Sequence, residues 1–156
     1  MELRTIRERR FRMNALDYDV IDYCEDAPLP LAGAVSLEEM LKEKEMTFSE
    51  ALLDWLIRKD LKDSDVYKKA NIDRKLFSKI RSDVHYKPSK PTAIAFAISL
   101  ELSLEETEDM LKKAGFALSH SNKFDIIIEY FISKGNYNIF EINEALFAFD
   151  QSLLGA

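Results

Sequence analysis

The chain has 156 residues, 47% of them apolar and 32% charged, and its formal net charge is −6. This length predicts one ordinary domain, or one domain and an arm, and the composition excludes wholesale disorder. No apolar run approaches the roughly 20 residues that are needed to cross a bilayer. One cysteine, two histidines and four well-separated glycines leave too few residues for a disulfide, a Cys/His zinc site or a glycine-rich phosphate loop, so we expect no enzyme, metal or cofactor.

The first 35 residues are typical of an arm and a linker. Residues 1–12 carry five arginines with no apolar stretch behind them, so they are not a signal peptide. Residues 17–26 are acidic with interleaved aromatic side chains, and residues 27–33 read as an extended linker. Cys24 lies in this arm and favours a reducing, cytoplasmic setting. We expect the arm to order on a partner or to fold back on the helical body.

Charge is distributed unevenly along the chain. The net charge is +3 over residues 1–12, −7 over 13–46, +1 over 47–118 and −3 over 119–156. Residues 61–90 hold nine lysines and arginines against four aspartates, a local charge of +5. A compact basic patch on an acidic protein indicates a nucleic-acid footprint, and the alternative is an ordinary solvated helical face.

Helical patterns follow from residue 36 onward, and no segment reads cleanly as a strand. Residues 36–39 form a capping box that predicts a short helix leading to Met46. A second capping box at 47–50 opens a helix that ends near residue 60, with Trp55 in the core. A short helix over about 63–70 is expected next, with Val66 and Tyr67 facing inward.

Asp73 is a natural N-cap for a helix through about Ser82, with Phe77 and Ile80 on its inner face. After a break around Pro88, Ser89 and Pro91 fit the first turn of a helix over 92–102, which is apolar on most sides and should be central. A capping box opens the next helix, which stops at Gly115. Two final helices, at 122–134 and from Asn138 onward, are rich in phenylalanine and isoleucine. They close the core or form a dimer or partner surface, and closure is favoured.

Two passages carry a resemblance to a known family. Residues 61–81 have the layout of helix two, turn and helix three of the lambda-repressor-like, XRE-type helix-turn-helix domain. Residues 86–89 followed by 93–106 are similar to that family's passage from Pro-Ser through helix four to Leu-x-Val-Ser-x-x-Glu. The resemblance covers residues 48–114 and implies an all-α fold with a compact five-helix core.

A second resemblance covers residues 36–156, which are similar to the helical domain that trails a macro (ADP-ribose-binding) domain in many Firmicutes proteins. The passages 67–81 and 143–150 carry it. The macro domain is missing here, so ADP-ribose chemistry is not implied. The predicted domains are an arm at 1–35 and a helical domain at 36–156, with a helix-turn-helix core at about 47–115 and a C-terminal pair at about 121–151.

The helix-turn-helix resemblance implies a non-enzymatic transcriptional or autoregulatory factor, of bacterial or mobile-element origin, that binds double-stranded DNA. Its third helix would enter the major groove with its N-terminal residues leading, where an arginine can bind guanine with two hydrogen bonds. The implied DNA-contacting residues are basic or carry a hydroxyl: Arg74, Lys75, Ser78, Lys79, Arg81, Lys87 and Lys90.

Three residues depart from the family pattern. Asp63 and Asp65 stand at the start of helix two, where they would repel the phosphate that a helix N-terminus attracts. Tyr67 stands where the family usually has alanine, and its ring is expected to push helices two and three apart or change their angle. Both departures would weaken DNA reading while the fold is kept.

An alternative is a protein-binding inhibitor or adaptor. Small phage or mobile-element inhibitors, including anti-CRISPR proteins, often join an inhibitory part to a helix-turn-helix domain. The acidic arm would mimic nucleic-acid phosphates and occupy a basic groove of a nucleic-acid enzyme, unless it is only a solubilising arm. The residues that would bind this partner are the acids and tyrosines of the arm: Asp17, Tyr18, Asp19, Asp22, Tyr23, Glu25 and Asp26.

Overall fold

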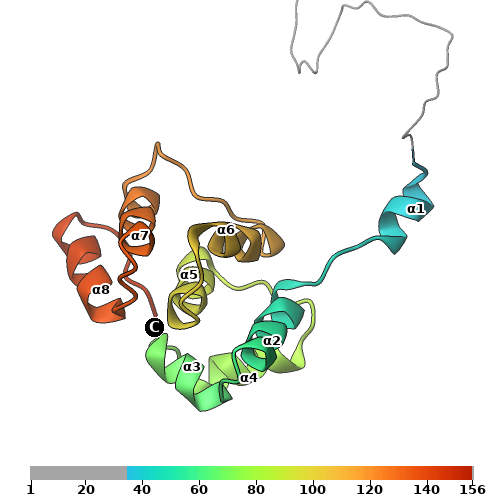
Figure 1. Cartoon of the computed structure of the whole chain (residues 1–156), viewed down its shortest axis with the longest axis horizontal. Helices are drawn as coiled ribbons and strands as arrows, with labels where there is room; N and C mark the ends of the chain where they lie inside the picture. The colour runs from blue at the N-terminus through green and yellow to red at the C-terminus, as the bar shows by residue number, and fades with distance from the viewer. Residues whose placement is uncertain (1–34, 156) are drawn as a thin grey trace, which may run out of the picture. The chain divides into compact units, whose positions relative to one another are not determined.

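The structure, a computed structural model, describes residues 35–155 (Figure 1). This part of the chain contains eight helices and no strand, so the predicted all-α class is confirmed. None of the helices in this part is long and apolar enough to cross a membrane. The chain divides into two units between Lys44 and Glu45, whereas the sequence suggested a boundary at residues 35 and 36. Helix α1 (Leu37–Lys42) therefore belongs to the N-terminal unit.

Helix α1 begins as predicted but is shorter than expected. The Ser36 hydroxyl accepts a hydrogen bond from the Glu39 amide at 3.2 Å, and the Glu39 carboxylate accepts one from the Ser36 amide at 3.0 Å. The prediction of a helix that leads to Met46 is wrong, because six residues with no buried side chain have only local interactions to hold them. The apolar side chains of α1 are exposed: Leu37, Met40 and Leu41.

The second unit begins with three helices at the predicted positions. The Thr47 hydroxyl accepts a hydrogen bond from the Glu50 amide at 3.3 Å, as expected of the capping box. The Asp73 carboxylate accepts a hydrogen bond from the Lys75 amide at 3.2 Å, as expected of an N-cap. The three helices are α2 (Phe48–Arg58), α3 (Asp63–Lys69) and α4 (Arg74–Ser82), and α4 packs against both of the others.

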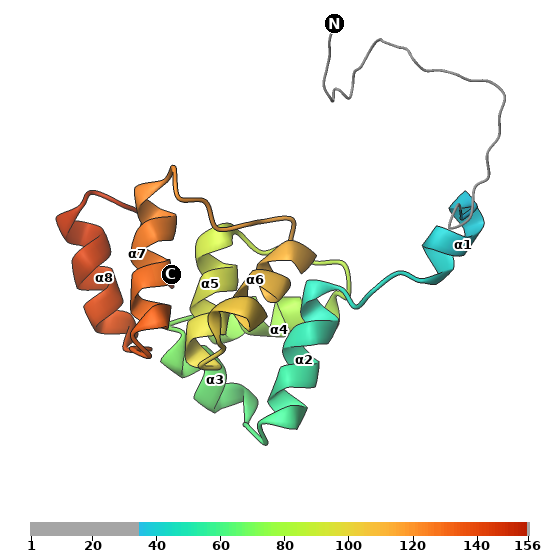
Figure 2. The same ribbon diagram turned by 45° about the horizontal axis from the view of Figure 1, so that its top comes forward.

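Helix α5 (Lys90–Ser99) lies at the centre of the second unit (Figure 2). Every residue from Ala93 to Ser99 is buried, because α5 contacts α3, α6 and α8. The helix begins and ends earlier than the predicted range of 92–102. Ser89 caps it at its N-terminal end. At the other end Glu101 takes a left-handed conformation, with φ of 55°, that a helix cannot continue.

Three further helices close the domain. The Ser103 hydroxyl and the Glu106 carboxylate form the expected capping box on α6, with hydrogen bonds of 3.2 and 2.9 Å. Asn122 and Asn138 cap the last two helices through their side-chain oxygens. The helices are α6 (Leu104–Lys113), α7 (Lys123–Ser133) and α8 (Ile139–Ala148), with α6 against α2, α5 and α7, and α8 against α5 and α7.

The C-terminal pair closes the core and also keeps aromatic side chains in solvent. Ile139, Ile142 and Leu146 of α8 are buried, which agrees with the favoured interpretation. On the opposite side of α8, Phe140 is 72% exposed and Phe147 is 75% exposed. The pair therefore presents an apolar outer face as well as an inner one.

Six helices of the second unit end with the same hydrogen-bonded turn. In each, one residue has a left-handed backbone, and the amide after it donates to the carbonyl five residues earlier. The expected glycine occupies this position in only two of the six turns. The left-handed residues are Asp60, Asn71, Glu101, Gly115, Gly135 and Asp150.

The residues after α8 return to the turn between α3 and α4. The Asn143 side chain accepts a hydrogen bond from the Leu154 amide at 2.7 Å and donates one to the Leu154 carbonyl at 3.1 Å. Gly155 follows with φ of 83°, and a β-carbon there would lie 2.6 Å from the Asn71 carbonyl oxygen. Only glycine allows this close approach, which ties the C-terminal segment to the α3–α4 turn.

Candidate nucleic-acid interface

Helix α4 separates an apolar side from a basic side. Phe77 and Ile80 are buried, and the Phe77 ring lies 5.9 Å from the ring of Phe96 on α5. These two anchors fix the rotation of α4 about its own axis. The residues that then point to solvent carry cations or hydroxyls: Arg74, Lys75, Ser78, Lys79, Arg81 and Ser82.

The tyrosine on α3 is accommodated between the two helices. The Tyr67 ring is half-buried and packs at 5.5 Å, centre to centre, on the Phe77 ring, with the planes tilted by 43°. Val66 beside it is buried, as predicted. Helices α3 and α4 are in contact with the bulky ring packed between them.

A groove of about 400 Å³ lies between α3 and α4. Its floor contains the Tyr67 and Phe77 rings, and its rim carries the hydroxyls of Ser64 and Ser78. One ion pair spans it, from the Arg81 guanidinium to the Asp63 carboxylate at 2.5 Å. The rim also carries two cations with no ion-pair partner among residues 35–155: Lys62 and Arg74.

The residues implied for DNA contact separate into two groups. Lys75 and Lys79 lie on the exposed face of α4 with Arg74, and Lys87 is exposed in the following loop. The Lys79 ammonium lies 5.9 Å from the Tyr86 ring centre, a cation–π distance. Ser78 is also exposed on α4.

The second group consists of Arg81 and Lys90, whose charges are neutralised within the domain. Lys90 lies at the start of α5, and its ammonium is 2.7 Å and 2.8 Å from the two carboxylate oxygens of Asp125 on α7. Asp125 is only 1% exposed, so this pair belongs to the interior. Lys90 is therefore not included in the surface proposed below for DNA contact.

Sequence reasoning did not include Lys62 and Ser64 in the candidate site. In the helix-turn-helix resemblance they stand at the start of helix two, and this position could have marked them as candidate DNA contacts. The pairing of Asp63 with Arg81 had no signal in the sequence, because 18 residues separate the two side chains.

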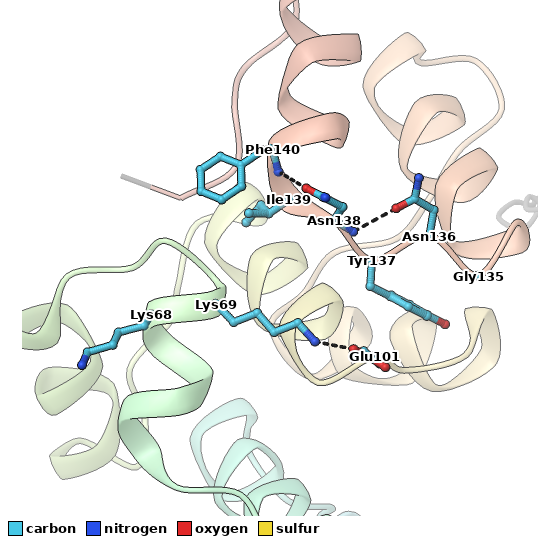
Figure 3. Close-up of a pocket in the computed structure, with 9 residues that line it drawn as sticks. All are labelled: Lys68, Lys69, Glu101, Gly135, Asn136, Tyr137, Asn138, Ile139 and Phe140. Atoms are coloured by element: carbon cyan, nitrogen blue, oxygen red, sulfur yellow. Dashed lines mark hydrogen bonds and ion pairs between the residues drawn. The ribbon is translucent and has the colours of Figure 1, made fainter.

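A second groove, of about 630 Å³, lies between α3 and the α7–α8 turn (Figure 3). Most of its polar groups are bonded within the protein, and Lys68 is a lining cation with no ion-pair partner among residues 35–155. Lys69 pairs with Glu101, and Asn138 accepts hydrogen bonds from the Phe140 and Glu141 amides. The Tyr137 hydroxyl donates to the Leu102 carbonyl at 2.9 Å. A ligand would therefore meet mainly the exposed Phe140 ring and the Lys68 ammonium, and we do not assign the functional site to this groove.

Burial raises the pKa of Tyr137 above its ordinary value, and the nearby carboxylates of Glu101 and Glu106 raise it further. The neutral phenol is therefore favoured, which suits a hydroxyl that donates a hydrogen bond. Its hydrogen bond joins the α7–α8 turn to the end of α5, so the role of Tyr137 is to hold these segments together.

Both histidines of residues 35–155 lie on the surface. Cys24 lies outside the described residues, as do the seven arm residues implied in partner binding. His85 is exposed, and His120 is exposed and lies 2.7 Å from the Glu129 carboxylate. Within this part of the chain, no group of three or more metal-ligating side chains is close enough to hold an ion.

Comparison with known proteins adds no relative to this picture. No family model, no curated protein and no solved structure matches the chain.

Proposed function

We propose that the protein is a DNA-binding regulator of the helix-turn-helix type, with α3 and α4 as the two helices of the motif. The observation that carries this proposal is the exposed basic face of α4, which Phe77 and Ile80 orient toward solvent. Helices α2 to α6 supply the five-helix core that the lambda-repressor-like resemblance implies. Helix α4 then enters the major groove with Arg74 and Lys75 leading.

Electrostatics supports this face over the rest of the surface. Within residues 35–155, five cations on or beside this face form no ion pair, and Arg81 is the exception because it pairs with Asp63. Such unpaired cations release counterions when they meet phosphates, and each one contributes about 0.9 to the salt slope of binding. The unpaired cations of this face are Lys62, Arg74, Lys75, Lys79 and Lys87.

The test is duplex binding by the full-length protein. A duplex sequence is first selected from a random pool, and its affinity is then measured at low and moderate salt. We expect Arg74→Ala with Lys75→Ala to weaken binding by at least tenfold, because a good base contact provides about 1–3 kcal/mol. The salt slope should fall by about 2, since two cations are lost.

The control variant is Lys112→Ala with Lys123→Ala, which removes the same charge from α6 and α7. Neither α6 nor α7 packs closely against α4, so this variant should keep the wild-type affinity to within about threefold, because surface charges away from the contact are screened by salt. If the Arg74/Lys75 variant binds duplex DNA as well as the wild type, or if the wild type selects no duplex, the proposed function is wrong.

We infer a second candidate, a protein-binding adaptor, from the outer face of α8. Phe140, Phe147 and Phe149 are each more than half exposed on or directly after one short helix, and aromatic side chains of this kind anchor protein interfaces. A second copy of the chain is the simplest partner to test, by sedimentation of the full-length protein. Self-association that Phe140→Ser with Phe147→Ser abolishes would support this candidate, and a monomer in both cases would contradict a homodimer.

A further inference from the structure

The ion pair between Asp63 and Arg81 lies at the groove between α3 and α4. Asp63 is the first residue of α3, and Arg81 lies near the end of α4, so the pair closes one side of the groove between them. Both side chains are about half exposed, at 43% for Asp63 and 53% for Arg81. An ion from solvent can therefore reach either of them.

The chemistry of this groove favours an anion. A guanidinium binds carboxylates and phosphates with the same two-pronged geometry, so either group can satisfy Arg81. Lys62 and Arg74 stand on the same rim with no ion-pair partner among residues 35–155, and they add to the positive potential. A carboxylate supplied by the chain itself, that of Asp63, takes the position on Arg81 that a backbone phosphate would take.

We propose that the Asp63 carboxylate competes with the DNA backbone for Arg81. Asp63 holds the guanidinium until a phosphate displaces the carboxylate, and this competition lowers the affinity for duplex DNA. This inference rests on the proposed function, since it concerns the same surface. Arg81 is then a phosphate contact that is masked in the free protein. Asp63 acts through Arg81 and through its own charge, and it touches no base.

The expected size of the effect follows from the exposure of the pair. Half-exposed ion pairs are weak in water, so a phosphate displaces the carboxylate readily, and its removal should tighten duplex binding by about two- to fivefold. A matched control stands two residues away: Asp65 lies in the same first turn of α3, is exposed, and forms no ion pair among residues 35–155. Asp65→Asn removes the same charge without releasing an arginine.

The experiment measures full-length wild type, Asp63→Asn, Asp65→Asn, Arg81→Ala and the double variant Asp63→Asn with Arg81→Ala. The probe is a fluorescent duplex of mixed sequence, titrated at several salt concentrations. We expect Asp63→Asn to bind more tightly than Asp65→Asn and to steepen the salt slope by about 0.9, because one more cation meets a phosphate. In the Arg81→Ala background, Asp63→Asn should improve binding no more than Asp65→Asn does. Asp63→Glu should restore the wild-type slope.

The possible outcomes distinguish this inference from the proposed function. Equal gains for Asp63→Asn and Asp65→Asn, or a gain that persists without Arg81, would overturn the competitor role while leaving DNA binding in place. No duplex binding by the wild type or by any variant would overturn the proposed function, and the inference with it. Helicity and the thermal midpoint of each variant are measured alongside. A loss of duplex affinity in Asp63→Asn with unchanged helicity would also overturn the competitor role of Asp63.

Discussion

Two neighbouring residues of α8 show that position in the fold decides what an apolar side chain contributes. Leu146 is completely buried, whereas Phe147 is 75% exposed. We expect Leu146→Ala to lower the free energy of unfolding by about 2–5 kcal/mol, because it leaves a cavity in the core. Phe147→Ala should change it by no more than about 0.5 kcal/mol, as expected of a surface substitution. Urea unfolding of the two variants measures both values.

The same two variants test whether the outer face of α8 is exposed to solvent in the free protein. If Phe147→Ala lowered stability as much as Leu146→Ala does, the Phe147 ring would be covered by a second copy or by another part of the chain. A concentration-dependent unfolding midpoint would then identify a second copy as the cover. The sequence indicated apolar residues at both positions, and burial alone separates their roles.

At the scale of the element, helix starts were predictable and several helix ends were not. Side chains cap the starts through short-range patterns, so Ser36, Thr47, Asp73 and Ser103 marked them in the sequence. The ends depend on one left-handed residue. Glycine predicts such a residue at Gly115 and Gly135, but aspartate, asparagine and glutamate take the conformation elsewhere, in turns that the same backbone hydrogen bond closes.

This difference gives a prediction for two helix ends. Gly115 has φ of 85°, and the space that a β-carbon would occupy there is open, so Gly115→Ala should lower stability by about 1 kcal/mol through backbone conformation alone. Asp60 has φ of 53° at the end of α2, so Asp60→Gly should raise stability by about 0.5–1 kcal/mol. Thermal and urea unfolding give the two signs. A loss of stability in Asp60→Gly would mean that the aspartate side chain stabilises this turn.

At the scale of the whole molecule, ion pairs between distant segments alter the site that the sequence suggested. The +5 charge of residues 61–90 counts every cation, whereas the fold pairs Lys69 with Glu101, Arg81 with Asp63 and Lys90 with Asp125. Local patterns predicted the basic helix α4 and its inner anchors. They could not predict these pairs, because each joins residues that are 18 or more positions apart.

The ion pair of Lys90 and Asp125 connects the central helix α5 with the C-terminal helix α7. Its loss should therefore lower the free energy of unfolding of the domain. Asp125 also accepts a hydrogen bond from the Ser119 amide at 2.8 Å, so one carboxylate joins α5, α7 and the loop before α7. Lys90→Ala leaves a buried charge without its counterion. We expect a loss of about 3 kcal/mol, the lower end of the range for such pairs, because the lysine side chain is 23% exposed.

A double variant separates the cost of an orphaned charge from the value of the pair itself. Lys90→Met with Asp125→Leu removes both charges and keeps apolar volume, so it should recover part of the stability lost in Lys90→Ala, reduced by the cost of the Ser119 amide that loses its acceptor. Asp54→Asn, which breaks a surface pair with Arg58 at 2.9 Å, should cost less than about 1 kcal/mol. If Lys90→Ala cost no more than Asp54→Asn in urea unfolding, Lys90 would not be committed to the interior. It would then be free to contact DNA as the helix-turn-helix resemblance implies.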